Sequence, residues 1–136
     1  NLPVQNFDLT YQLISYSTKK NTFRGMHYQT APYAQNKLIV LHSGSIIDLA
    51  VDANNALIDQ VLSFEMSAGD AILIPENYAH GFISTTDDVL MQYFMDEVYS
   101  AENYKGLNCQ KYLKREFPEL DLIISVKDQK LQNSLI

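Results

Sequence analysis

Hydrophobic and polar residues alternate over short runs along most of this chain, and turn-forming residues interrupt the runs about every eight to twelve positions. Alternation places one side of each strand against a core, and a succession of such strands is typical of an all-β sandwich or barrel. We expect strands over residues 11–16, 22–29, 37–42, 45–51, 57–66, 71–74, 80–84, 89–95 and 122–126.

Turn residues mark the predicted connections between these strands. Gly44 separates two of them, and the segments Asp-Ala-Asn-Asn (52–55) and Ser-Ala-Gly-Asp (67–70) are predicted hairpin loops. Pro75 follows a strand and has no N–H to donate to a central ladder, so it suits the rim of a barrel.

Helix is expected only in the last third of the chain. Residues 100–104 are predicted to form a helical turn with Ser100 as its cap, and residues 111–116 a short helix that ends before Pro118. No repeat, linker or low-complexity tract divides the 136 residues, so we expect one domain over residues 1–136.

Composition narrows the classes of partner and the compartment. The net charge of −6 argues against general nucleic-acid binding, which depends on neutralising phosphates. The apolar runs are far shorter than a membrane span, and the first residues lack the pattern of a signal peptide. The single Cys109 cannot form an internal disulfide, which fits a reducing cytoplasm.

Two blocks about fifty residues apart carry the chemistry. The first reads Arg-Gly-Met-His-Tyr-Gln (24–29), followed by Lys37 and Gly44. The second has Gly69 and then Ile-Pro-Glu-Asn-Tyr-Ala-His-Gly-Phe (74–82). The spacing resembles that of the two sequence motifs of cupins, small β-barrels. Gln29 and Lys37 stand where metal-binding cupins carry a His and a Glu, so the resemblance implies a barrel site without a metal.

Further motifs sharpen the resemblance to one family. Besides the run Thr-Phe-Arg-Gly-Met-His-Tyr-Gln (22–29), they include segments 32–38, 44–52 and 74–82, the Ser-Val-Lys-Asp of residues 125–128, and two tyrosines six apart. In this order they resemble dTDP-4-dehydrorhamnose 3,5-epimerases from about residue 12 to residue 128. The resemblance implies a cupin double-stranded β-helix, or jelly-roll, barrel with short C-terminal helical segments. It also implies a homodimer that needs no metal or organic cofactor, and family members usually carry some forty more residues ahead of this segment.

The resemblance also implies catalytic roles. Moving a hydrogen beside a ketone needs a base, stabilisation of an enolate, and an acid on the opposite face. By resemblance His27 is the base, and Asp128 holds its other ring nitrogen. Lys37 and His80 stabilise the enolate oxygen, and Tyr93 is the acid.

The substrate-binding residues implied in the same way are Arg24, Gln29, Gln12 and Tyr99, and we add Asp48 to this set. Arg24 offers a planar fork suited to a diphosphate, Gln12 matches a position that contacts the nucleotide base, and Tyr99 matches a pocket-wall residue. A lysine pointing into an apolar barrel needs a partner, and Asp48 is the inward-facing candidate to form an ion pair with Lys37.

The function we expect is epimerisation of a nucleotide-linked 4-keto-6-deoxy sugar at carbon 3, carbon 5 or both, in rhamnose-type deoxysugar biosynthesis. Two alternatives stay open. One is a keto-sugar isomerase of the same barrel type, which needs the base but no opposite acid. The other is a sugar- or nucleotide-binding cupin without catalysis. A metal-dependent oxygenase is disfavoured by Gln29 and Lys37 at ligand positions.

Overall fold

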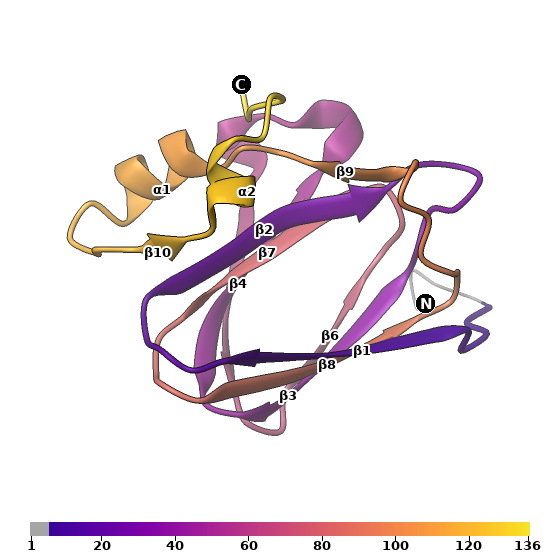
Figure 1. Cartoon of the computed structure of the whole chain (residues 1–136), viewed down its shortest axis with the longest axis horizontal. Helices are drawn as coiled ribbons and strands as arrows, with labels where there is room; N and C mark the ends of the chain where they lie inside the picture. Colours follow the sequence, from indigo (N-terminus) through magenta and orange to yellow (C-terminus); the bar gives the residue numbers. More distant parts are fainter. Residues whose placement is uncertain (1–5) are drawn as a thin grey trace.

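A computed structural model of the chain, which describes residues 6–136, consists mainly of β-strands in two facing sheets (Figure 1). The strands of sheet A run in the order β1 (Tyr11–Ser17), β8 (Val89–Met95), β3 (Lys37–Ser43) and β6 (Ala71–Ile74). Sheet B runs in the order β10 (Ile123–Ile124), β2 (Thr22–Gln29), β7 (Tyr78–Ser84), β4 (Ser45–Asp52) and β5 (Leu62–Ser67), and β9 (Tyr104–Gly106) also pairs with β2.

The chain crosses from one sheet to the other at almost every connection. From β1 to β8, only β4 and β5 are both consecutive and neighbours in the same sheet. All ladders are antiparallel except the short one between β10 and β2. This connectivity is the double Greek key of a jelly-roll barrel, which confirms the predicted all-β class.

Most predicted strands occur with boundaries that match or are shifted by at most two residues, but the strand expected at 57–66 is shorter. The chain instead forms the 3₁₀ turns η1 (Ala53–Asn55) and η2 (Ile58–Gln60) before β5 begins at Leu62. The Ile58 N–H donates to the Ile136 carbonyl, and the β4–β5 ladder ends at the pair Ala50–Leu62. The predicted hairpin at 52–55 is therefore a longer connection between the same two strands.

Three other predictions were wrong in detail. Residues 67–70 do not close a hairpin, because they carry the chain from β5 in sheet B to β6 in sheet A. Residues 100–104 form a turn closed by an Asn103 N–H to Ser100 carbonyl bond and lead into β9 rather than a helix. The strand expected at 122–126 is only β10, since Ser125 caps the short helix α2 (Val126–Gln129) through the Asp128 N–H. The helix predicted at 111–116 is α1 (Gln110–Glu116).

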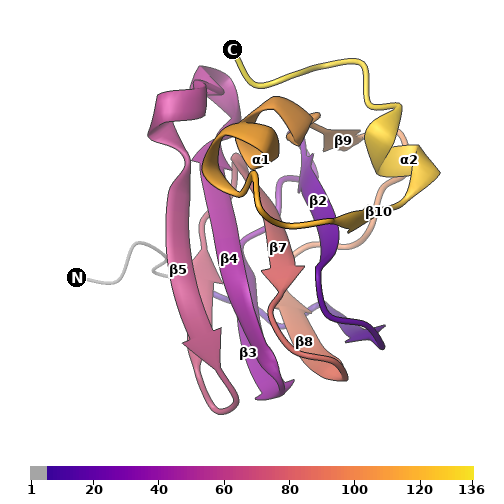
Figure 2. The same ribbon diagram turned by 90° about the vertical axis from the view of Figure 1, so that its left-hand side faces the viewer.

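Two hydrophobic clusters hold the layers together. One fills the barrel between the sheets and includes Ile39, Leu41, Ile46, Phe82 and Met91. The other lies on the outer face of sheet B, where Leu113 of α1 and Leu135 of the C-terminal segment pack with Phe23, Met26 and Leu49 (Figure 2). Within residues 6–136, no helix is long and apolar enough to cross a membrane.

A register shift in β2 sets up the site. Strand alternation would place Arg24 and His27 on opposite faces, because they are three residues apart. The β2–β7 ladder shifts between these two residues, and such an irregularity brings both side chains to the barrel interior. The strands are close here: a Cβ on Gly81 would lie 2.7 Å from the Arg24 carbonyl oxygen. Glycine in the second motif is thus required by the approach of the two strands.

Candidate active site

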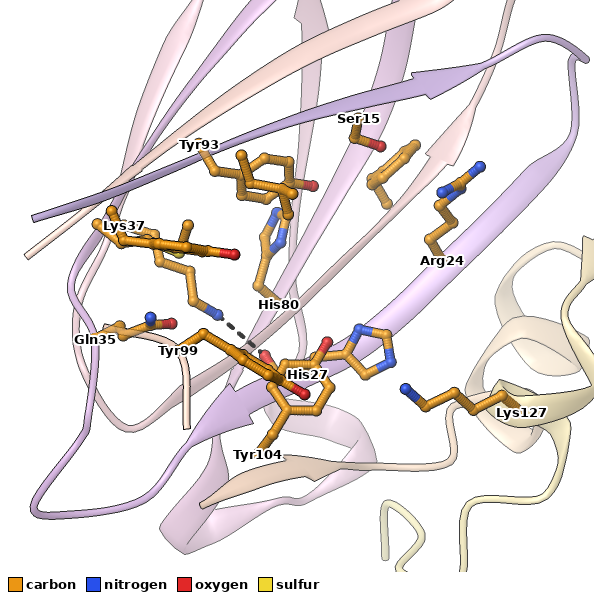
Figure 3. A pocket seen from close by; sticks show the side chains of 14 residues that line it. Ser15, Arg24, His27, Gln35, Lys37, His80, Tyr93, Tyr99, Tyr104 and Lys127 are labelled. Carbon is orange, nitrogen blue, oxygen red and sulfur yellow. Dashed lines mark hydrogen bonds between the residues drawn. The ribbon is translucent and has the colours of Figure 1, made fainter. Parts of the chain in front are cut away.

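The barrel interior opens into a pocket of about 400 Å³ (Figure 3). Its walls come from both sheets, from the loop after β8, from β9 and from α2. Six of the side chains that the sequence singled out line it: Arg24, His27, Lys37, His80, Tyr93 and Tyr99. The two motif histidines are register partners in the β2–β7 ladder, which explains why residues far apart in sequence meet here.

His27 is held by a carboxylate. Its Nε2 lies 2.7 Å from Asp128 Oδ1, and the Gly25 N–H donates to Asp128 Oδ2 at 3.1 Å. Burial alone would raise the pKa of Asp128, but the hydrogen bonds from His27 and Gly25 outweigh it, so its pKa lies below the usual value. A carboxylate acceptor keeps the proton on Nε2 and leaves Nδ1 with a free lone pair. His27 is therefore arranged as a base.

Tyr93 lies across the pocket from His27. It comes from β8 in sheet A, whereas His27 comes from β2 in sheet B (Figure 3). Its ring makes an edge contact with His80, with the centroids 5.9 Å apart. Burial, with smaller contributions from Asp48 and Tyr104, raises the pKa of the Tyr93 phenol well above its ordinary value. The phenol therefore keeps its proton through neutral pH and can serve as a donor.

Lys37 and His80 also line the pocket, and Lys37 brings positive charge to it. The Lys37 Nζ donates to the His27 carbonyl oxygen at 3.3 Å, and the residue is only 8% exposed. Burial lowers the pKa of Lys37 to about 8, although the Asp48 carboxylate opposes this shift. His80 Nε2 lies 2.6 Å from Asp48 Oδ1, so the carboxylate fixes the orientation of that ring.

The ion pair expected between Asp48 and Lys37 is not formed. Asp48 does face inward and is fully buried, but its Oδ1 bonds to His80, and no hydrogen bond reaches its Oδ2 from the described residues. Asp48 does not line the pocket. It acts on Lys37 through its charge and on His80 by direct contact, so the sequence placed it correctly and assigned it the wrong partner.

Two residues expected to bind substrate lie elsewhere. The Gln29 side chain is 2% exposed, donates to the carbonyls of Tyr33 and Val98, and accepts from the Ser100 N–H. It fastens the loops beside the pocket. The β1 residues that face the pocket are Tyr11, Leu13 and Ser15, so alternation places Gln12 on the outer face of the strand. There its side-chain oxygen accepts a hydrogen bond from Gln92 Nε2 at 3.0 Å.

Two more cationic side chains, those of Arg24 and Lys127, line the pocket. Arg24 lies on the same face of β2 as His27, and one guanidinium N–H donates to the Tyr16 carbonyl at 3.3 Å. Lys127 reaches in from α2, one residue before Asp128. With Lys37, three cations converge on one cavity of a protein whose net charge is −6. This concentration of positive charge suits an anionic ligand.

Sequence reasoning missed Tyr104 and gave Lys127 no role, although both line the pocket. The motif Ser-Val-Lys-Asp (125–128) contains Lys127, so that residue could have been found. Tyr104 carries no local signal, because only the pairing of β9 with β2 brings it beside His27. In residues 6–136, no three His, Cys, Asp or Glu side chains gather as a metal site.

A base on one wall, a protonated phenol on the other and a cationic group between them suit one type of chemistry. The base can remove a proton next to a carbonyl, and the cations can stabilise the oxyanion that results. The phenol can deliver a proton to the face opposite the base. Such an arrangement can invert a carbon atom.

Comparison with known proteins agrees with this geometry. A family described as dTDP-4-dehydrorhamnose 3,5-epimerase matches residues 4–134. The dTDP-4-dehydrorhamnose 3,5-epimerase of Sinorhizobium fredii is 35% identical over 97 residues, which are 68% of this chain and 50% of that protein. The protein of the same name from Escherichia coli is 32% identical over 121 residues, 84% of this chain and 65% of that protein. The chain thus spans about half to two thirds of these curated relatives.

Solved structures give the same result. The crystal structure of dTDP-4-dehydrorhamnose 3,5-epimerase from Bacillus anthracis, with TDP and PPi bound, is 32% identical and superposes with a TM-score of 0.84. The match covers 95% of this chain and 77% of that one. The corresponding protein of Sulfolobus tokodaii is 28% identical with a TM-score of 0.78, over 93% of this chain and 72% of that one. The fold is therefore the cupin jelly roll of these proteins.

Proposed function

The chain belongs to the dTDP-4-dehydrorhamnose 3,5-epimerase family, and we propose that it epimerises a nucleotide-linked 4-keto-6-deoxy sugar at carbon 3, carbon 5 or both. The observation that carries the proposal is the placement of His27 and Tyr93 on opposite walls of one pocket. A binding protein has no need of this pair, and an isomerase that returns the proton on one face has no need of the second member.

In the proposed reaction, His27 removes the proton from the carbon beside the 4-keto group. The C–H bonding pair becomes the double bond of an enolate, and the carbonyl pair moves onto the oxygen. Lys37 and His80 stabilise that oxygen, and Asp128 stabilises the imidazolium. The enolate then collapses and takes a proton from the Tyr93 hydroxyl on the opposite face, so the carbon is inverted. Proton transfer through solvent restores His27 and Tyr93.

The cations of the pocket wall are proposed to hold the substrate diphosphate. Arg24 supplies a planar fork and Lys127 a point charge, the two kinds of group that bind phosphate oxygens. The similar protein from Bacillus anthracis is described with TDP and PPi bound, which supports a nucleotide-linked substrate here. We propose no role for a metal or organic cofactor, since each proton transfer has its own side chain.

The proposal is tested by incubating the protein with dTDP-4-keto-6-deoxyglucose in deuterated water and following the sugar protons by NMR. Deuterium at an inverted carbon 3 and carbon 5 supports double epimerisation, and at one of them single epimerisation. Transfer of the carbonyl to a neighbouring carbon would identify the isomerase. Absence of exchange, with tight binding of the sugar nucleotide, would identify a binding protein and overturn the proposal.

A homodimer is proposed from the outer face of sheet A. By alternation and register, this face carries Ile14, Tyr16, Leu38, Val40, Leu73, Leu90 and Phe94, with Gln12, His42 and Gln92 among them. Ile14 is 65% exposed and Tyr16 50% exposed. Among residues 6–136, both α-helices lie on the other sheet (Figure 1). An uncovered apolar sheet face favours association with a second copy.

Light scattering after size exclusion tests this proposal. The protein should have twice the 15.5 kDa mass of one chain, and Val40→Glu with Phe94→Glu should reduce it to one. A monomer at micromolar concentration would contradict it.

We also propose that the described residues act as one catalytic domain in the cytoplasm. The buried Cys109, whose thiol pKa burial raises to about 12, is consistent with a thiol that takes no part in redox chemistry.

A further inference from the structure

Tyr104 is the pocket aromatic closest to the base and has no part in the reaction proposed above. It begins the short strand β9, opposite Gln29 and two residues along the ladder from the position paired with His27. The Tyr104 and His27 ring centroids lie 5.2 Å apart with an interplanar angle of 33°. The distance lies within the range of interacting aromatic rings, and the two ring planes are tilted.

The Tyr104 ring is itself held in place. Lys127 Nζ lies 5.4 Å from its centroid, within the range of a cation–π contact. Tyr99 makes an edge contact with it, the two centroids being 5.6 Å apart. A ring fixed from two directions restricts the neighbouring imidazole, which is otherwise held only through Asp128 at one nitrogen.

We infer that Tyr104 is a positioning residue for the base: its ring limits rotation of the His27 imidazole, and its π face stabilises the imidazolium that forms when His27 takes a proton. The inference rests on the proposed function, in which His27 is the base. It adds to Asp128 a second group that favours the charged ring, from a different element and in a different direction.

The charged groups around His27 show why a second favourable group matters. The titratable or charged side chains that line the pocket with it are Asp128's neighbour Lys127 on α2, Arg24 on β2, Lys37 on β3, His80 on β7, Tyr93 on β8, Tyr99 in the loop after β8, and Tyr104 on β9, and Asp128 itself bonds to the ring. Only Asp128 among these is an anion, and Arg24, Lys37 and Lys127 oppose a positive charge. Burial, with Asp128 and Tyr99, raises the pKa of Tyr104, so its ring stays neutral and acts through its π face.

Two substitutions separate the ring from its hydroxyl. Tyr104→Leu removes the π face, and Tyr104→Phe keeps it. In the ligand-free protein labelled with ¹⁵N-histidine, the NMR titration midpoint of the His27 ring should fall by about 0.3 to 0.7 pH unit in Tyr104→Leu, which corresponds to a two- to fivefold loss of imidazolium stability. In Tyr104→Phe it should return to within about 0.2 pH unit of wild type.

The kinetic consequence should follow the same order. In Tyr104→Leu, kcat for deuterium exchange should fall about three- to tenfold with KM nearly unchanged, because the ring acts on the base rather than on the substrate. Tyr104→Phe should restore most of kcat. Thermal unfolding of both variants checks that they fold.

Two results would overturn the inference. One is a Tyr104→Leu protein that folds, titrates and turns over like wild type. The other is a loss in Tyr104→Phe as large as in Tyr104→Leu, which would assign the effect to the hydroxyl. The NMR titration needs no substrate, so it separates this inference from the proposed function. If the wild-type protein exchanges no proton of any keto sugar, the proposed function is contradicted. If Tyr104→Leu nevertheless shifts the His27 titration midpoint, the effect of the Tyr104 ring on His27 is still supported.

Discussion

Lys37 should give the protein two pH dependences of opposite sign, one in stability and one in rate. Its ammonium is buried, and burial lowers the pKa to about 8. In the unfolded chain the side chain is solvated and titrates near pH ~10.4. Between these two values the unfolded state binds more protons than the folded state, so the free energy of unfolding rises with pH.

The size of the stability change follows from the two pKa values. Integration of the proton-binding difference from pH 7.5 to pH 9.5 gives a gain of about 2 kcal/mol. The range ends there because exposed tyrosines of the unfolded chain ionise near pH ~10. Urea denaturation followed by circular dichroism measures the change, and Lys37→Met is the matched control, since it keeps an unbranched side chain and cannot titrate.

The rate should move in the other direction. If the charged form of Lys37 stabilises the enolate, kcat/KM should fall about tenfold between pH 7 and pH 9, as the protonated fraction drops from about 0.9 to about 0.1. Lys37→Met should be slow at every pH and should lack this alkaline limb. A falling rate in a protein that is gaining stability cannot be attributed to unfolding.

Two results would refute this reasoning. Parallel changes in stability for wild type and Lys37→Met from pH 7.5 to pH 9.5 would mean that Lys37 is solvated in the folded protein. A kcat/KM that stays level up to pH 9 would mean that its charge does not contribute to the rate.

Four further predictions concern other parts of the structure. Asp128→Asn should lower kcat by about a hundredfold or more, because an amide cannot stabilise the imidazolium; steady-state kinetics and a thermal melt distinguish this from misfolding. The pKa of Asp128 is lowered on folding, so its stabilising effect should be fully present above the unfolded carboxyl pKa of about 3.9 and lost as the pH falls through the lower pKa of the folded state; a wild-type advantage over Asp128→Asn that does not shrink as the pH is lowered through the acidic range would contradict this. Gly81→Ala should destabilise the fold by about 1–3 kcal/mol in urea denaturation, since its Cβ would meet the Arg24 carbonyl; an unchanged free energy of unfolding would contradict this. Elemental analysis of the purified protein should find no stoichiometric zinc, iron or manganese, because the cation Lys37 stands in the site; one tightly held ion whose removal abolishes activity would oppose this.

The sequence predicted the all-β fold and six of the pocket residues, because strand alternation and the motifs that carry the family resemblance are local in the sequence. Alternation located the strands, and the two glycine-framed motifs located His27 and His80, whose register pairing then brings them together. Lys37 was recognised as a cation inside an apolar barrel, and the structure places it there.

What the sequence could not predict depends on pairing between distant segments. Two side chains, Lys37 and His80, were candidate partners for the inward-facing Asp48. Only the register between β4 and β7 brings Asp48 into contact with His80 rather than Lys37. Gln12 was misplaced because the face that β1 turns inward is set by its pairing with β8. Tyr104 was missed because β9 is three residues long and is defined only by its ladder with β2.

The central claim is that a base and an acid act from opposite walls, and Tyr93→Phe tests it most directly. This variant keeps the buried ring and deletes the proton donor. In deuterated water with a 4-keto-6-deoxy nucleotide sugar, His27 should still exchange the substrate proton with retention of configuration. Inversion should fall by about 10²–10⁴-fold. Exchange without inversion is the expected result, and inversion at the wild-type rate would show that Tyr93 is only part of the wall and that the two-wall mechanism is wrong.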